Sequence, residues 1–237
     1  MPVRVASPGY LIDITMSFTD VVIVGAGQAG LAMSRCLGVL GIEHVVLERG
    51  GVAERWKTAT WDSLRMLTPN WMNGLPWQPY DGADPHGFMT KGEVSLFLER
   101  YASSLPVLRH AEVLSLDAAD GQYRVRTTQG DWRARAVVIA TGHCDVPLIP
   151  PSAASLSPEM CSLHSSAYRS PGALEDGGVL VVGASASGVQ IADELRRAGR
   201  EVFISVGRHT RLPRSWRGHD IFWWPVSYTH LTLPTKA

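Results

Sequence analysis

The 237-residue sequence predicts an α/β fold in which one strand–turn–helix pattern occurs twice, with a small antiparallel sheet between the two copies. The first copy is VVIVGAGQAG, residues 21–30, and the second is VLVVGASASG, residues 179–188. Between them, residues 112–142 alternate apolar and polar positions in three short runs separated by DG and QG, which is typical of a three-stranded β-meander. Because an apolar strand that enters a helix through a glycine turn is typical of dinucleotide binding, we expect two Rossmann-like domains.

Composition excludes several classes of partner. The 22 basic and 22 acidic residues balance, so no overall charge draws the chain to nucleic acid or to an anionic membrane surface. The three cysteines are far apart and form no CxxC pair, which argues against a disulfide framework and a zinc site. No apolar stretch reaches the roughly 18 residues that a membrane span needs. We therefore expect a cytoplasmic protein with a small-molecule partner.

The two ends of the chain differ in character from the rest. Residues 1–15 precede Met16 and lack the continuous apolar centre of a secretion signal, so we expect a leader that is non-native or disordered. The stretch VSYTHLTLPT, residues 226–235, resembles the translation of a DNA adapter used in sequencing libraries. We therefore expect residues 226–237 to be a non-native tail on a C-terminally truncated protein.

In the first copy, the pattern predicts a strand over 21–24, a tight turn over 25–30, a helix over 31–40 and a second strand over 44–48. This order places the turn at the carboxyl end of the first strand. The amino end of the following helix offers free N–H groups and a positive dipole to phosphates. The pattern therefore predicts an anion-binding turn that needs no basic side chain.

Three glycines and one acid give this first copy its chemistry. Gly25 allows the sharp turn, Gly27 lets the backbone approach a pyrophosphate, and Gly30 lets the helix pack closely on the strand. Glu48 ends the second strand, where a carboxylate accepts hydrogen bonds from the ribose hydroxyls of an adenosine. We call residues 25–30 the first loop.

The second copy repeats the plan with two differences. Gly183 and Gly188 keep the first and third glycine positions, whereas Ser185 stands at the middle position. The strand that follows the helix ends without an acid and leads instead to Arg208. A guanidinium there can bind a 2′-phosphate, so this site is expected to prefer NADP to NAD, although Arg208 could also be a solvated loop residue. We call residues 183–188 the second loop.

The run AVVIATG at the end of the meander reads as a buried strand that returns to the first sheet. Thr141 and Gly142 would then lie at the carboxyl edge of that sheet, where α/β folds bind ligands. The proline-rich stretch 147–158 follows as a linker into the second nucleotide domain. This order predicts that the second domain is inserted in the first.

Several segments in order, from residue 20 to residue 224, resemble the flavin-containing monooxygenase family, including its plant YUCCA branch and bacterial relatives. They are GAGQAG with Glu48, ERW, WDSLRMLTP, TKGEVSLFLERYA, VVIATGHCDVPLIP, HSSAYRSP, VLVVGASASG and LPRSWRGHDIFWW. Ahead of the second loop, His164 and Tyr168 keep half of the family's FxGxxxHxxxY motif, while Pro158 and Met160 replace its phenylalanine and glycine.

The resemblance implies FAD in the first loop, NADPH in the second, and molecular oxygen and a small organic molecule as substrates. NADPH would reduce the flavin, and a flavin hydroperoxide would insert one oxygen atom into the substrate. It implies an FAD domain over 16–148 and a partial NADP domain over 149–225. His164 and Tyr168 would position the linker and NADP.

Residues 56–70 follow the first βαβ unit, where the family lines the flavin, so Trp56, Arg65, Thr68 and Asn70 are candidate neighbours of the cofactor; a tryptophan there could equally pack in the core. Together, the loops and the resemblance give these expected cofactor-binding residues: Gly25, Gly27, Gln28, Ala29, Gly30, Glu48, Arg49, Trp56, Thr68, Val113, Thr141, Gly142, Gly183, Ser185, Ser187, Gly188 and Arg208.

Two alternatives stay open. A flavoprotein disulfide reductase has a similar two-nucleotide build, but it needs a redox-active cysteine pair, and Cys144 and Cys161 are not spaced as one. The other is an inactive, truncated nucleotide-binding fragment. A flavin domain without its last strands would expose apolar surface and an unpaired sheet edge, so we expect the 237-residue chain to be poorly soluble.

Overall fold

A computed structural model describes residues 16–119, 121–208 and 213–224; the predicted leader and tail lie outside these ranges. The chain divides into two compact units. The first holds the described residues up to Thr60, then Leu75–Pro79 and Lys91–Ala167, and the second holds Trp61–Gly74, Tyr80–Thr90 and the described residues from Tyr168 onward. Within the described ranges, no helix is long and apolar enough to cross a membrane.

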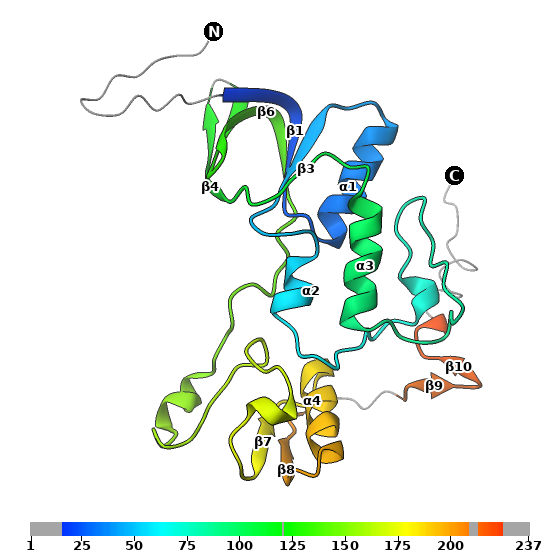
Figure 1. The fold of residues 1–237 in the computed structure, drawn as a ribbon, viewed down its shortest axis with the longest axis vertical. Helices are drawn as coiled ribbons and strands as arrows, with labels where there is room; N and C mark the ends of the chain where they lie inside the picture. Colours follow the sequence, from blue (N-terminus) through cyan, green and yellow to red (C-terminus); the bar gives the residue numbers. More distant parts are fainter. Residues whose placement is uncertain (1–15, 120, 209–212, 225–237) are drawn as a thin grey trace. The chain divides into compact units, whose positions relative to one another are not determined.

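The first unit contains a six-stranded sheet whose order is β3-β2-β1-β6-β5-β4 (Figure 1). Its strands are β1 (Met16–Val24), β2 (His44–Leu47), β3 (Val107–Leu108), β4 (Val113–Ala119), β5 (Gln122–Thr127) and β6 (Gly130–Ile139). The first four in that order run parallel, and β5 and β4 continue antiparallel. The parallel part confirms the predicted α/β class, and the antiparallel part is the predicted meander.

Strand β6 joins the two parts of this sheet. It pairs with β5 over its first half and with β1 along its whole length, from Met16 opposite Asp131 to Val24 opposite Ile139. The meander and the returning strand of the sequence analysis are thus one continuous element. The prediction that this return is buried was wrong, because Ala136 and Ile139 are exposed and Val137 and Val138 are only half-buried. Among the described strands, only β1 pairs with β6 at Ile139, because β5 pairs with the first half of β6 alone.

Helices α1 (Gln28–Val39) and α3 (Lys91–Ala102) lie together on one side of the sheet, and α1 contacts β1 and β2 (Figure 1). A short helix, α2 (Glu54–Thr58), follows β2. On the opposite face, Val22 and Leu47 pack with Val125 and Ala134 of the meander. Since side chains alternate between the faces of a strand, this arrangement buries both faces of β1 and β2.

The second unit is built on β7 (Val179–Val182), α4 (Ala186–Arg197) and β8 (Val202–Ser205). β7 and β8 are parallel, as neighbouring strands joined by a crossover helix are. Two short strands, β9 (Ser215–Trp216) and β10 (His219–Asp220), form a hairpin. Trp61, Tyr168, Ile191 and Leu195 form the core of the unit. Short 3₁₀ segments complete the chain: η1 (Asn70–Met72), η2 (Pro151–Ser155) and η3 (Pro171–Ala173).

Candidate functional site

The backbone of the first loop requires two of its glycines. Gly25 has φ +106°, and a Cβ there would lie 2.6 Å from the carbonyl oxygen of Ala140. A Cβ on Gly30 would lie 1.9 Å from the carbonyl oxygen of Gly25. Real Cβ atoms do not approach a carbonyl oxygen so closely, so a side chain at either position would force the loop apart. These two glycines are explained by the fold alone.

Gly27 is different, because the fold does not require a glycine there. Its φ is −82°, an ordinary value for any residue, and it precedes α1 as the N-cap. Beyond its chain neighbours, no atom of the described residues lies within 4 Å of where its Cβ would be. The space beside Gly27 is therefore open to a ligand, as the close approach of a pyrophosphate to this loop requires.

Glu48 connects the first loop to the end of β2. Its half-buried carboxylate accepts hydrogen bonds from the N–H of Ala26, at 2.7 Å, and from the N–H of Gly50, at 2.9 Å. Each carboxylate oxygen keeps a further lone pair, so the group can still accept bonds from ribose hydroxyls. The structure thus places the Glu48 carboxylate beside the first loop.

Four more of the expected residues lie in this loop or beside it. Gln28 and Ala29 are exposed on the first turn of α1, which begins three residues earlier than predicted. Thr141 and Gly142 are exposed and follow β6, and a Cβ on Gly25 would lie 3.4 Å from the Cα of Thr141. The carboxyl ends of β1, β2 and β6 therefore bring these residues to one edge of the sheet.

Arg49 forms an ion pair that the sequence did not suggest. Its guanidinium group donates two hydrogen bonds to Asp145, at 2.5 and 3.0 Å, and Arg55 donates to the same carboxylate at 2.5 Å. The hydrogen bond from Arg49 holds the pKa of Asp145 below its ordinary value, and the same bond raises the pKa of Arg49. No local sequence pattern marks this pair, because its partners are far apart along the chain.

The second loop repeats the backbone of the first. Gly183 has φ +105°, and a Cβ on Gly188 would lie 1.9 Å from the carbonyl oxygen of Gly183. Ser185, with φ −82° and ψ −175°, matches Gly27, with φ −82° and ψ −174°. The two loops are therefore equivalent position by position, and the middle position accepts a side chain.

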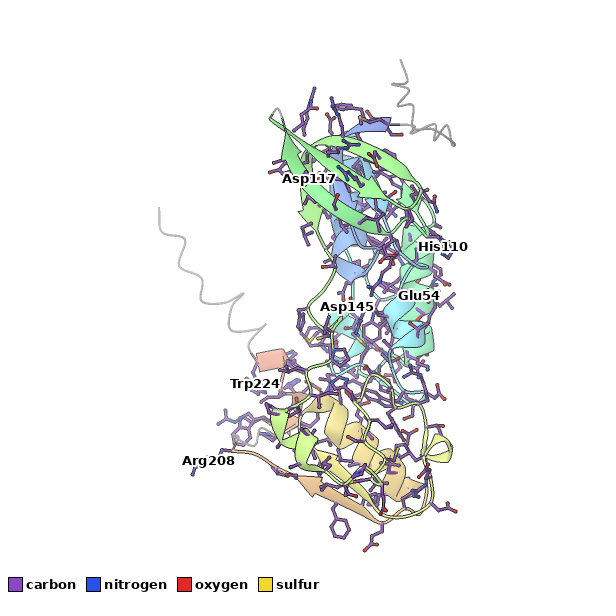
Figure 2. The ribbon with its side chains drawn as sticks, turned by 90° about the vertical axis from the view of Figure 1, so that its left-hand side faces the viewer. Glu54, His110, Asp117, Asp145, Arg208 and Trp224 are labelled. Atoms are coloured by element: carbon purple, nitrogen blue, oxygen red, sulfur yellow. The ribbon has the colours of Figure 1, made fainter. Side chains whose placement is uncertain are left out.

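Ser187 is part of the second loop, whereas Arg208 lies outside it. Ser187 lies half-buried in the first turn of α4. Arg208 follows the last residue of β8 by three positions and is exposed. Figure 2 shows its side chain at the outer edge of the second unit, directed away from it. This exposure leaves the guanidinium group accessible to an anion.

Three expected residues lie outside both loops. Trp56 is half-buried on α2 in the first unit, and Val113 begins β4 and packs against the core of that unit. Thr68 lies in the second unit, where its hydroxyl donates to the side-chain oxygen of Asn73. The buried side-chain amide of Asn70 donates to the carbonyl of Asp84 and accepts from the N–H of Met89, so it holds this loop together.

Tyr168 and His164 are likewise engaged within the protein. The Tyr168 hydroxyl is buried and donates to Glu194 at 2.9 Å. Burial, with a further contribution from Glu194, raises the pKa of Tyr168. Nδ1 of His164 accepts a hydrogen bond from the N–H of Ser166.

Gln190 on α4 is a residue that the sequence analysis missed. Its side-chain amide accepts from the N–H of Arg65 at 3.1 Å and donates to the carbonyl of the same residue at 3.0 Å. It therefore fastens the segment around Arg65 to the helix that follows the second loop.

Comparison with known proteins identifies related sequences. A family model described as pyridine nucleotide-disulphide oxidoreductase matches residues 22–216. An uncharacterized CzcO-like oxidoreductase of Geobacillus kaustophilus is 42% identical over 86% of this chain and 59% of its own length. A rice protein named indole-3-pyruvate monooxygenase YUCCA1 is 32% identical over 91% of this chain and 57% of its own.

Among solved structures, a flavin-containing monooxygenase from Stenotrophomonas maltophilia superposes with a TM-score of 0.75 at 29% identity, over 84% of this chain and 61% of that one. The chain thus spans about three fifths of the length of the relatives named here.

Proposed function

Because the chain belongs to the pyridine nucleotide-disulphide oxidoreductase family, we propose that the whole protein is an FAD-dependent monooxygenase that uses NADPH and molecular oxygen. The observation that supports this most is the repetition of one loop geometry, with φ +106° at Gly25 and +105° at Gly183. A flavoenzyme that is reduced by a nicotinamide needs a binding site for each cofactor. One chain with two equivalent loops meets that need.

We assign FAD to the first loop. The open space beside Gly27 admits the pyrophosphate, and the amino end of α1 supplies N–H groups and a positive dipole to it. Glu48 is fixed by its bonds to Ala26 and Gly50 and orients its free lone pairs toward the ribose hydroxyls. When bound, the flavin supplies the capacity to activate oxygen and transfer one oxygen atom. The residues of this chain bind and orient it.

We assign NADPH to the second loop. No carboxylate follows β8 as Glu48 follows β2, and the exposed Arg208 stands in its place. A guanidinium group can donate two hydrogen bonds to a 2′-phosphate, which a carboxylate would repel. This difference favours NADPH over NADH.

The relatives support oxygen transfer to a small organic substrate. The rice relative is named as a monooxygenase of indole-3-pyruvate, and the structure from Stenotrophomonas maltophilia is a flavin-containing monooxygenase. Disulfide reduction is the less favoured function for this protein. Cys36, Cys144 and Cys161 are all free, and no two of them are spaced as a redox pair.

The test uses the full-length protein. Its visible absorption is recorded, NADPH is added without oxygen, and the measurement is repeated with NADH. We expect a yellow protein whose flavin absorption NADPH bleaches faster than NADH does. Colourless protein would contradict the assignment of FAD to the first loop.

The variant R208A tests the assignment of NADPH. It is expected to raise the KM for NADPH on the order of 10- to 100-fold, as expected for the loss of charge-assisted hydrogen bonds, and to change the KM for NADH little. The control is R197A, which removes an exposed arginine of the same unit whose partner is Asp193 of its own helix. Equal changes for both nucleotides in R208A would refute the role of Arg208.

A further inference from the structure

Asp145 gathers two arginines beside the first loop. Its carboxylate lies 2.5 Å from the guanidinium groups of both Arg49 and Arg55. Arg55 also donates to the carbonyl oxygen of Cys144, so it holds the backbone of this segment as well as the side chain. We call these contacts the Arg49–Asp145–Arg55 bridge. It ties the segment that follows β6 to the segment that follows β2.

The sheet order shows which edge the bridge spans. β1 lies between β2 and β6, and all three are parallel. Arg49 follows the end of β2 by two residues, and Asp145 follows the end of β6 by six. The bridge therefore links the two flanking strands across the carboxyl end of β1, the end from which the first loop begins. Figure 2 shows Asp145 close to α2, the helix that carries Glu54 and Arg55.

The exposure of the bridge argues that the fold does not depend on it. The side chains of Arg49, Arg55 and Asp145 are 53%, 37% and 39% exposed. Ion pairs with this much contact to water add little to folding stability.

We propose that the Arg49–Asp145–Arg55 bridge is a clasp that retains FAD, with Asp145 as the positioning residue that holds the two arginines and residues 141–145 across the carboxyl end of β1. The proposal rests on the assignment of FAD to the first loop. The dinucleotide then leaves only when the bridge opens. The cost of opening appears in the rate of FAD release rather than in the stability of the fold.

The experiment measures FAD release from the full-length holoprotein of the variant D145N, which keeps the shape of the side chain and removes its charge. Release is followed by the recovery of flavin fluorescence after dilution. We expect D145N to release FAD on the order of tenfold faster, because two charge-assisted contacts are lost. Added salt should speed release from the wild type and affect D145N much less, since salt screens an exposed ion pair.

The matched control is E99Q. It breaks the pair between Lys57 and Glu99, which also joins two segments of the first unit and is similarly exposed, at 37% and 42%. E99Q should release FAD at the wild-type rate. The melting temperatures of the two apo-variants should agree. A lower melting temperature for D145N would indicate that Asp145 has a merely structural role.

The possible outcomes separate the clasp from the proposed function. A wild-type protein that binds no FAD contradicts the proposed function and removes the basis of the clasp. A yellow wild type whose release rate equals that of D145N within twofold overturns the clasp alone. If D145N lowers the melting temperature, D145E decides, because its retained carboxylate must slow release relative to D145N; equal rates overturn the proposal.

Discussion

Gly27 and Ser185 occupy the same position of two equivalent loops, yet only one has a side chain. Their φ and ψ angles agree within one degree, so the backbone accepts serine at either place. The glycine at position 27 is therefore best explained by a ligand and not by the fold. This distinguishes Gly27 from Gly30, where a Cβ would meet a carbonyl oxygen at 1.9 Å.

The variant G27S should fold normally and bind FAD weakly. Its melting temperature should stay close to that of the wild type, while the Kd for FAD should rise by about three- to tenfold, because the added hydroxymethyl group narrows the space for the pyrophosphate without closing it, as is expected of Ser185 in the second loop. The control G30A should lose about 1–3 kcal/mol of stability through overpacking. Fluorescence titration and thermal melting measure both effects. Unchanged FAD affinity in G27S would show that the pyrophosphate does not lie beside Gly27.

Tyr168 links stability to alkaline pH. Its pKa is raised in the folded protein above the ordinary value of 10.0, first by burial and then by Glu194. The folded state therefore keeps the phenol proton to higher pH than the unfolded state does. The stabilisation is complete below about pH 10 and is lost as the pH rises from there through the folded pKa.

The variant Y168F tests this dependence. At pH 8 it should be less stable by about 1 kcal/mol, because the bond to Glu194 is lost. The difference in melting temperature between wild type and Y168F should shrink between pH 9 and pH 11, as the wild type loses its contribution. A constant difference in melting temperature over this range would show that the buried hydroxyl does not cause the loss of stability at alkaline pH.

At the scale of elements, β7 and β8 form a sheet with one covered face. Val179, Val181 and Val202 pack against the core of the second unit, whereas Leu180, Val182 and Phe203 are 62%, 74% and 59% exposed. The run VLVV reads as a strand buried on both faces, which is the usual state in parallel sheets. Within the described residues, nothing covers the outer face, so this unit presents an apolar patch.

The patch predicts self-association of the 237-residue chain. The double variant L180T/F203T should bind less of a dye that reports exposed apolar surface and should elute as a smaller species, with little change in stability. The control V181T places a polar group against the core and should be destabilised instead. A wild-type chain that stays monomeric, binds no dye and unfolds cooperatively would contradict the prediction.

At the scale of the whole molecule, the sequence predicted the two strand–turn–helix–strand units well. Strand β2 began at its predicted first residue and ended one residue before its predicted end, and α1 began within three residues of its predicted start. The sequence did not indicate that residues 61–74 and 80–90 belong to the second compact unit. Trp61 packs in the core there with Tyr168, although more than one hundred residues separate them. No local pattern encodes such a contact.

The sequence by itself determined the features that depend only on residues close together in the chain. Gly30 belongs to this class, because the clash that excludes a Cβ there is with Gly25, only five residues away. The tertiary structure alone decided the pairings between distant segments. Asp145 meets Arg49 across 96 residues, and Gln190 meets Arg65 across 125. These contacts form only when parallel strands bring their carboxyl ends to one edge, or when a helix packs on a distant loop, because only packing fixes the separation between segments that are far apart in sequence.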